Sequence, residues 1–279
     1  MRLPVSEPLS QLRTVAGLGC FLPVAAGALG LGVVSGNRRD GVNFFTANWP
    51  RLMLAAGGVT TNVLGSENLT AQRPAVFIFN HRNVFDVFIA AALVRDNWTA
   101  VGKKELENDP IAGTIGRIVD AAFIDRDDAR AAVEGLHKVE ELAKKGLSII
   151  IAPEGTRVDT SDGVGPFKKG PFRIAMTANI PIVPVVIRNA ESIAPRDSTI
   201  LHPCTVDVAV FPPVSVDGWT HANLPEHIAA VHDLYRNTLA AWPLDKLPQI
   251  KIGAQAPTSA KRKRTAAQKD SGAKRRTPK

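Results

Sequence analysis

The chain has 279 residues, of which 45% are apolar, and it carries a formal net charge of +8 at neutral pH. This length and composition are those of a globular protein with one sizeable domain or two small ones. The two cysteines, Cys20 and Cys204, lack metal-binding or redox spacing, which excludes a disulfide-rich scaffold and fits a reducing compartment.

Residues 1–64 are predicted to form an apolar, membrane-associating helical segment. From Val15 to Val34 there are twenty residues without a charge, and a bilayer crossing needs about 20 apolar residues. Five glycines and Pro23 weaken this stretch as a plain helix, and arginines flank both of its ends. We expect membrane insertion, either spanning or as a re-entrant helical hairpin, rather than secretion; the alternative is a helix pair buried in a soluble core. Residues 42–64 are predicted to form a second helix, which would lie in the membrane interface with Trp49 near the headgroups.

Residues 65–250 alternate between strand-like and helical patterns, which predicts an α/β domain with a central β-sheet flanked by helices. The strand-like runs lie at residues 75–79, 147–152, 182–187 and 205–210. Helical spacing of apolar residues is clearest at residues 128–145, and further helices are predicted at 172–179 and 223–242.

Residues 251–279 are predicted to be a disordered basic tail, because small and charged residues dominate them. From Pro257 onward there are nine basic residues and one acid, so this segment alone carries a charge of +8. The rest of the chain holds 25 basic and 25 acidic residues and is formally neutral. Nucleic acid is therefore not an expected partner of the folded domain. A tail that binds nucleic acid is the alternative, but attraction to anionic lipids is preferred, since the tail has no aromatic residue to stack on bases.

A histidine and a carboxylate lie in the segment Asn80–Asp86, between an apolar strand and an apolar run that is long enough for a helix. His81 would then sit where a strand ends and a helix begins, a common position for chemistry in α/β proteins. Asp86, five residues later, is placed to orient His81 as a general base. The structural alternative is that Asn83 caps the helix and Asp86 is the acid favoured in its first turn.

A second group of polar residues follows the strand at 147–151, in the sequence Ala-Pro-Glu-Gly-Thr-Arg (residues 152–157). Gly155 permits a tight turn, which would present Glu154, Thr156 and Arg157 at the edge of the sheet. The rigid donor fork of Arg157 suits a phosphate group.

Other cations add to a possible anion site. Lys168 and Lys169 precede a helical pattern, and a helix N-terminus with nearby cations binds anions. Lys103 and Lys104 are further candidates, although a solvated surface charge is the alternative for each lysine. Arg126 ends the sequence Phe-Ile-Asp-Arg, where a local surface ion pair with Asp125 is the alternative. The run 182–187, Ile-Val-Pro-Val-Val-Ile, has no reactive side chain and is predicted to be a buried strand that shapes a pocket floor or acyl channel.

In their order and spacing these clusters resemble four sequence blocks of the glycerolipid acyltransferases, specifically the bacterial 1-acyl-sn-glycerol-3-phosphate acyltransferases, or PlsC-like family. The resemblance covers roughly residues 40–215. Residues 80–86 resemble the family's NHxxxxD block, residues 123–126 its FIDR block, residues 153–157 its PEGTR block, and residues 182–187 its proline-containing hydrophobic block.

The resemblance implies transfer of an acyl group from acyl-CoA or acyl carrier protein to the sn-2 hydroxyl of lysophosphatidic acid, which gives phosphatidic acid. His81 would be the general base and Asp86 would orient it. Arg126, Arg157 and Lys103 would hold the acceptor phosphate, and Glu154 and Gly155 would line the acceptor glycerol. Thr156 is a further expected substrate-binding residue.

The resemblance also implies no metal and no bound cofactor, contact with membrane lipids, and a place at the cell membrane with the active site on the cytoplasmic side. Two alternatives remain for the reaction. The acceptor could instead be glycerol 3-phosphate or a lysophospholipid, or His81 could activate water in a thioesterase.

Overall fold

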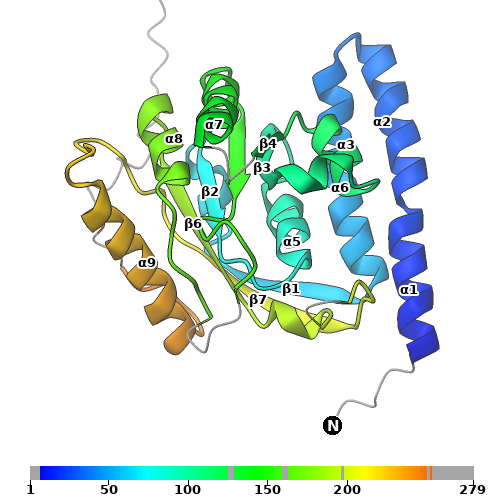
Figure 1. The fold of residues 1–279 in the computed structure, drawn as a ribbon. Coiled ribbons are helices and arrows are strands. Elements are labelled where there is room, and N and C mark those ends of the chain that lie inside the picture. Colours follow the sequence, from blue (N-terminus) through cyan, green and yellow to red (C-terminus); the bar gives the residue numbers. More distant parts are fainter. Residues whose placement is uncertain (1–6, 125–128, 159–162, 196–197, 250–251, 253–279) are drawn as a thin grey trace, which may run out of the picture.

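The computed structural model of the protein describes residues 7–124, 129–158, 163–195, 198–249 and 252. Within this part of the chain, helices cover a seven-stranded β-sheet, which confirms the predicted α/β class (Figure 1). The strands are β1 (Val59–Leu64), β2 (Val76–Phe79), β3 (Trp98–Lys103), β4 (Ala122–Ile124), β5 (Ser148–Ile151), β6 (Ile182–Arg188) and β7 (Cys204–Val210). The α-helices are α1 (Glu7–Gly19), α2 (Phe21–Ser35), α3 (Arg38–Ala56), α4 (Asn68–Ala71), α5 (Phe85–Val94), α6 (Ala112–Ile118), α7 (Ala129–Lys144), α8 (Gly170–Ala178) and α9 (Leu224–Ala240).

The order of strands across the sheet is β1-β7-β6-β2-β5-β3-β4. The five strands from β6 to β4 run parallel to one another, whereas β7 is antiparallel to β6 and pairs in parallel with β1. Parallel strands end at the same edge of a sheet, so the residues that follow β2, β3, β4, β5 and β6 meet at one carboxyl edge. This topology brings segments that are far apart in the sequence to one place.

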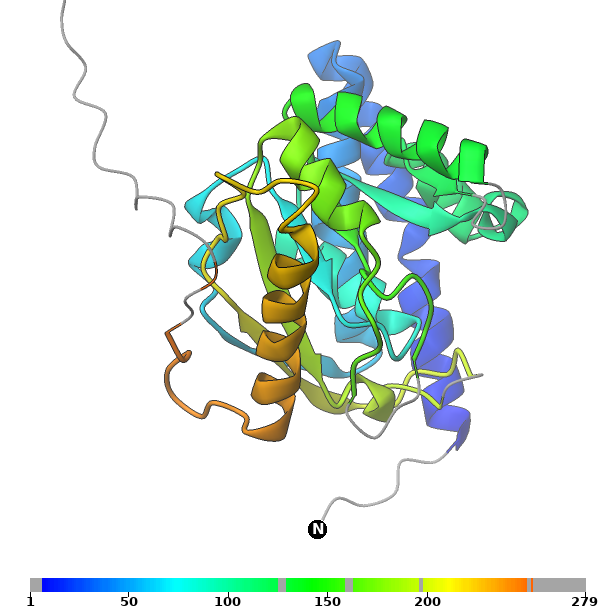
Figure 2. The same ribbon diagram turned by 60° about the vertical axis from the view of Figure 1, so that its left-hand side comes forward.

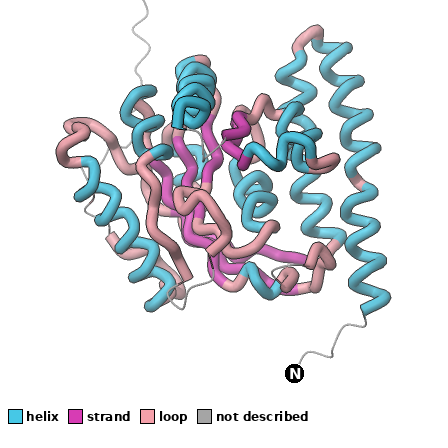
Figure 3. Tube along the Cα trace, viewed as in Figure 1, coloured by secondary structure: helices cyan, strands magenta, loops and turns pink. Residues whose placement is uncertain are grey.

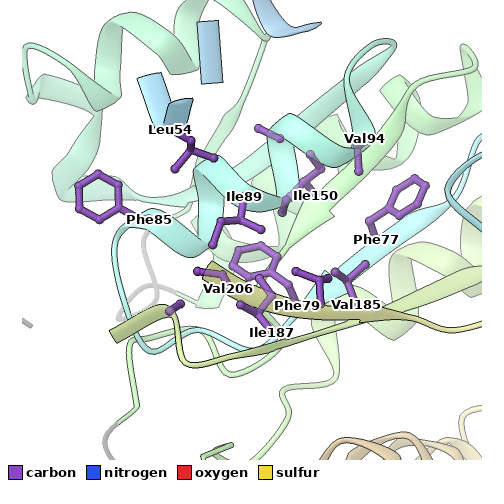
Figure 4. Close-up of a cluster of buried hydrophobic side chains, with 14 of the residues drawn as sticks. Leu54, Phe77, Phe79, Phe85, Ile89, Val94, Ile150, Val185, Ile187 and Val206 are labelled. Carbon is purple, nitrogen blue, oxygen red and sulfur yellow. The ribbon is translucent and has the colours of Figure 1, made fainter. Parts of the chain in front are cut away.

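The sheet separates two apolar cores. Side chains alternate along each strand, so Phe77 and Phe79 of β2 face the core that includes α3 and α5, and Val76 and Ile78 face the core that includes α7, α8 and α9. Figure 4 shows Ile89 of α5 lying over side chains of β2, β6 and β7 in the first core. Figures 2 and 3 show the two helical layers, with α8 and α9 on one side of the strands and the N-terminal helices on the other.

The N-terminal helices α1 and α2 form an almost continuous helix of 29 residues, which is long and apolar enough to cross a membrane. Many of its apolar side chains are exposed; Leu22, Leu29 and Val34 are 74%, 72% and 87% exposed. The alternative of a helix pair buried in a soluble core is therefore wrong for this segment. An exposed apolar surface of this kind indicates association with a membrane.

Helix α3 returns alongside α2 and joins these helices to the sheet (Figure 1). Trp49 is 1% exposed and packs against Phe21, Phe45 and Phe88. Our prediction that Trp49 lies near lipid headgroups is thus wrong, because its ring fills the junction between α2, α3 and α5.

The predicted helix over residues 42–64 is correct only for its first part. Helix α3 ends at Ala56, before two glycines, and Gly58 has a φ of +75°, which favours glycine. Val59–Leu64 is strand β1, paired with β7 at the edge of the sheet. Its β-branched residues suit a strand. The division of the chain into regions at residues 64 and 250 stays a prediction, and the tail from residue 253 onward lies outside the described residues.

Close contact between α2 and α3 depends on Gly41. A Cβ atom on Gly41 would lie 2.3 Å from the carbonyl oxygen of Ala28, so any larger residue forces the two helices apart. Gly30 of α2 offers a matched control, since a Cβ atom there would meet nothing within 4 Å.

We expect Gly41→Ala to lower the free energy of unfolding by about 1–3 kcal/mol through overpacking, despite the better helix propensity of alanine. Gly30→Ala should keep or raise stability. Thermal and denaturant unfolding of both variants measures the difference. Equal stability of the two variants would show that the helices do not pack as closely as described.

Candidate active site

The candidate site lies at the carboxyl edge of the sheet, where β2 and β5 are neighbours. β2 ends at Phe79, two residues before His81, and β5 ends at Ile151, three residues before Glu154. The two strands are parallel, so the loops that follow them leave the sheet side by side. Residues 81 and 154, which are 73 positions apart in sequence, thereby come into contact.

The carboxylate of Asp86 closes the turn between β2 and α5. Its Oδ2 atom accepts hydrogen bonds from the backbone N–H groups of Arg82 at 2.7 Å and Asn83 at 2.6 Å. The same oxygen lies 3.3 Å from Nδ1 of His81. Asp86 is 1% exposed and stands in the first turn of α5. The two interpretations of Asp86 therefore hold together: this carboxylate supports the helix start and also faces the histidine.

Asn83 fixes the same turn from the other side. Its Oδ1 accepts the backbone N–H of Phe85 at 2.9 Å, and its Nδ2 donates to the backbone carbonyl of Ala194 at 2.6 Å. The predicted capping role is thus present, although the residue in the N-cap position is Val84, one residue later than expected. The contact with Ala194 ties the turn to the segment that follows β6.

The position of Asp86 determines the tautomer of a neutral His81. An ionised carboxylate only accepts hydrogen bonds, so Nδ1 carries the proton and Nε2 carries the basic lone pair. The imidazole ring is 18% exposed and lies edge-on to Phe79, with the ring centres 5.7 Å apart. A partly exposed imidazole held by a buried carboxylate has the geometry of a general base with its orienting acid.

Glu154 is buried beside this histidine. Its Oε2 accepts the backbone N–H of His81 at 3.0 Å, and its Oε1 accepts that of Gly165 at 3.3 Å. Burial raises the pKa of Glu154 to about 8, against the opposing effect of these two N–H donors. The negative charge of Asp86 raises the pKa further. This carboxyl group therefore titrates close to neutral pH, in direct contact with the peptide group of the candidate base.

The segment after β5 also holds the backbone carbonyl of His81. The backbone N–H of Val158 donates to the carbonyl of His81 at 2.9 Å. Gly155 has a φ of +77°, which explains why glycine is needed at this turn. Thr156 is exposed and Arg157 is half-buried on the same turn. The structure thus brings together His81, Asp86 and the turn that carries Arg157.

The other cations that were predicted to bind substrate either lie elsewhere in the domain or fall outside the residues that the structure describes. Lys103 ends β3, is exposed and forms an ion pair with Glu105. Lys168 and Lys169 are exposed directly before α8, as expected. Arg126 lies outside the described residues, two positions after the end of β4. Substrate binding by any of these residues stays a prediction.

Two buried residues near the site were not predicted from the sequence. Asn80 exchanges two hydrogen bonds with Ile187 of β6, through Oδ1 at 2.7 Å and Nδ2 at 2.8 Å. Tyr235 of α9 binds both β2 and β6 through its hydroxyl group. Asn80 could have been found from its position next to His81 in the sequence. Tyr235 lies more than 150 residues from His81 in the sequence, and no local pattern marks it as part of the site. Among the described residues, no cluster of three or more His, Cys, Asp or Glu side chains could hold a metal ion.

Comparison with known proteins identifies the family. Residues 60–188 match the Acyltransferase family. The chain is 30% identical over 193 residues to the human 1-acyl-sn-glycerol-3-phosphate acyltransferase beta, which covers 69% of this chain and 68% of the human protein. It is 33% identical over 192 residues to the 1-acyl-sn-glycerol-3-phosphate acyltransferase of Saccharomyces cerevisiae, covering 68% of this chain and 62% of the yeast protein.

The similarity extends to a plant protein and to a crystal structure. A 1-acyl-sn-glycerol-3-phosphate acyltransferase of Cocos nucifera is 30% identical over 207 residues, or 74% of this chain and 65% of that protein. The chain thus spans less than two thirds of the coconut and yeast relatives. The crystal structure of the 1-acyl-sn-glycerophosphate acyltransferase PlsC from Thermotoga maritima shares the fold, with a TM-score of 0.66 at 20% identity over 83% of this chain and 97% of that one. The resemblance stated from the sequence blocks is confirmed: the chain belongs to the acyltransferase family that includes the 1-acyl-sn-glycerol-3-phosphate acyltransferases.

Proposed function

We propose that the protein transfers an acyl group from a thioester donor to the sn-2 hydroxyl of 1-acyl-glycerol-3-phosphate and so forms phosphatidic acid. The observation that carries this proposal is the contact of 3.3 Å between Nδ1 of His81 and the buried carboxylate of Asp86. The names of the relatives support the choice of reaction, since each is a 1-acyl-sn-glycerol-3-phosphate acyltransferase.

In the proposed mechanism, Nε2 of His81 takes the proton from the acceptor hydroxyl as its oxygen attacks the thioester carbonyl. The tetrahedral intermediate then collapses, the carbon–sulfur bond breaks, and the imidazolium returns the proton to the leaving thiolate. Asp86 keeps the imidazole in the required tautomer and stabilises its positive form. Because the acceptor itself is the nucleophile, the reaction needs no acyl-enzyme intermediate.

The turn after β5 is proposed to bind the acceptor. The guanidinium group of Arg157 matches a phosphate group, and it stands on the same turn as the groups that hold the peptide of His81. Lys103, which ends β3, and Arg126 are proposed as additional phosphate ligands. Gly155 and Thr156 are better placed to contact the glycerol than Glu154, whose two oxygens both bind backbone N–H groups.

The proposed donor is acyl-CoA or acyl carrier protein, and no metal or cofactor takes part. The exposed apolar surface of α1 and α2 would hold the enzyme on the cell membrane, with the active site on the cytoplasmic side, where a lipid acceptor can enter without crossing water. Glycerol 3-phosphate or a lysophospholipid is the alternative acceptor, and an acceptor screen with purified protein separates these cases.

The replacement His81→Ala should abolish acyl transfer while the protein stays folded, because loss of a general base typically lowers the rate about 10²–10⁴-fold. The matched control is His137→Ala, which removes an exposed histidine of α7 whose Nδ1 lies 3.1 Å from the buried Glu140. Transfer to lysophosphatidic acid is measured with one acyl-CoA or acyl carrier protein donor. Near-normal transfer by His81→Ala would refute the mechanism, and fatty-acid release without any acceptor would indicate a thioesterase instead.

The replacement Arg157→Ala should raise KM for lysophosphatidic acid more than KM for the matching acceptor without phosphate, because only the phosphate loses a charged partner. Arg236→Ala serves as the control for loss of a positive charge, since Arg236 is exposed on α9 and pairs with Asp233 at 3.8 Å. Steady-state kinetics with the two acceptors gives the comparison. An equal effect on both acceptors would exclude Arg157 as the phosphate ligand.

A further inference from the structure

Tyr235 connects α9 to the two strands that lie beneath the active site. Its hydroxyl group donates to the backbone carbonyl of Ile78 in β2 at 2.7 Å and accepts from the backbone N–H of Val185 in β6 at 3.0 Å. The residue is 0% exposed. Ile78 lies three residues before His81. The hydroxyl of Tyr235 therefore binds β2 near its carboxyl end, just before the turn that carries His81.

A second side chain joins the same two strands just beyond this point. Asn80 accepts the N–H of Ile187 and donates to its carbonyl, so its side-chain amide satisfies both backbone groups of Ile187 just beyond the last paired residue of β2. Tyr235 and Asn80 therefore fix β2 to β6 on either side of Phe79. The carboxyl end of β2 is held by side chains as well as by the strand ladder.

The ring of Tyr235 also supports the loop that contacts His81. It packs edge-on against Phe167, with the ring centres 5.2 Å apart. On the same helix, His232 contacts the carbonyl of Gly165 at 3.1 Å. The N–H of Gly165 in turn binds Glu154, whose other oxygen binds the peptide of His81. Helix α9 thus contacts β2, which ends just before His81. It also contacts the loop at residues 165–167, which binds Glu154.

The hydroxyl group of Tyr235 keeps its proton at neutral pH. Complete burial raises the pKa of Tyr235 well above its ordinary value, although the N–H of Val185 acts in the opposite direction. The hydroxyl therefore remains a donor to Ile78 at neutral pH.

We propose that Tyr235 is a positioning residue for His81. The proposal rests on the proposed function of His81 as general base. Without the hydroxyl, Ile78 and Val185 lose their shared partner and the end of β2 shifts relative to β6. A shift of ~1 Å in a reacting group can lower the rate about 10²-fold. The hydroxyl of Tyr235 binds β2 and β6 and not the proposed acceptor-binding turn at residues 154–157. The affinity for the acceptor should therefore change little.

Tyr235→Phe tests this inference against Thr238→Val as a matched control. Thr238 lies on the same helix, is also buried, and donates only to the carbonyl of Leu234 within that helix at 2.6 Å. Both variants lose one buried hydroxyl group, but only Tyr235→Phe affects β2 and β6. We expect kcat of Tyr235→Phe to fall about 10-fold or more, with KM for the acceptor unchanged. A kcat within twofold of Thr238→Val would overturn the positioning role.

A second replacement separates positioning from folding. The chain contains one tyrosine, so replacement of tyrosine by 4-aminophenylalanine during synthesis changes this position alone. An aryl amino group restores a donor at the same place, and we expect it to recover most of the lost kcat. Failure to recover kcat in folded protein would overturn the proposal. Absence of transfer by the unaltered protein would refute the proposed function instead, before any variant is compared.

Discussion

The candidate site depends on one buried carboxylate. Oδ2 of Asp86 receives two backbone N–H groups of the turn and faces Nδ1 of His81, all within seven residues of chain. Burial of a charged group is costly unless it is hydrogen-bonded, and here the turn and the start of α5 provide the donors and the positive end of a helix. The interaction that closes the turn is therefore also the one that orients the base. A loss of the carboxylate would disturb both at once.

This local turn becomes a site only through long-range contacts made by the parallel sheet. β5 lies next to β2, which brings Glu154 and Val158 to the N–H and carbonyl groups of His81. β6 lies on the other side of β2, and Asn80 and Tyr235 bind the two strands together. The segment after β5 thus holds the backbone of His81, and the contacts with β6 hold the two residues Ile78 and Asn80 that precede it in β2 and the turn. The N-terminal helices add an apolar surface that indicates membrane association, next to the core that holds α5.

Much of this arrangement could be predicted from the sequence, because β2, β5 and β6 are mainly apolar, β7 alternates apolar and polar residues in its first half, and α7 has a clear helical period. β1 and β3 were missed, since residues such as Thr60, Thr61 and Gly102 interrupt their apolar pattern, and β4 was missed because it is only three residues long. The contact between His81 and Asp86 was expected because both residues share one turn. The role of Tyr235 depends on the sheet order and on packing, neither of which a local pattern contains. Trp49 was misplaced for a related reason: an aromatic residue in an apolar helix suits a protein core as well as a membrane interface.

Asp86 sets the tautomer of His81, and nitrogen NMR of the imidazole tests this role directly. The protein has six histidines, so His81 is assigned by comparison with His81→Ala. Neutral His81 should carry its proton on Nδ1, and Asp86→Asn should shift or mix the two tautomers. A neutral His81 protonated on Nε2 in the unaltered protein would exclude the proposed base, because the nitrogen that should receive the acceptor's proton would already carry one.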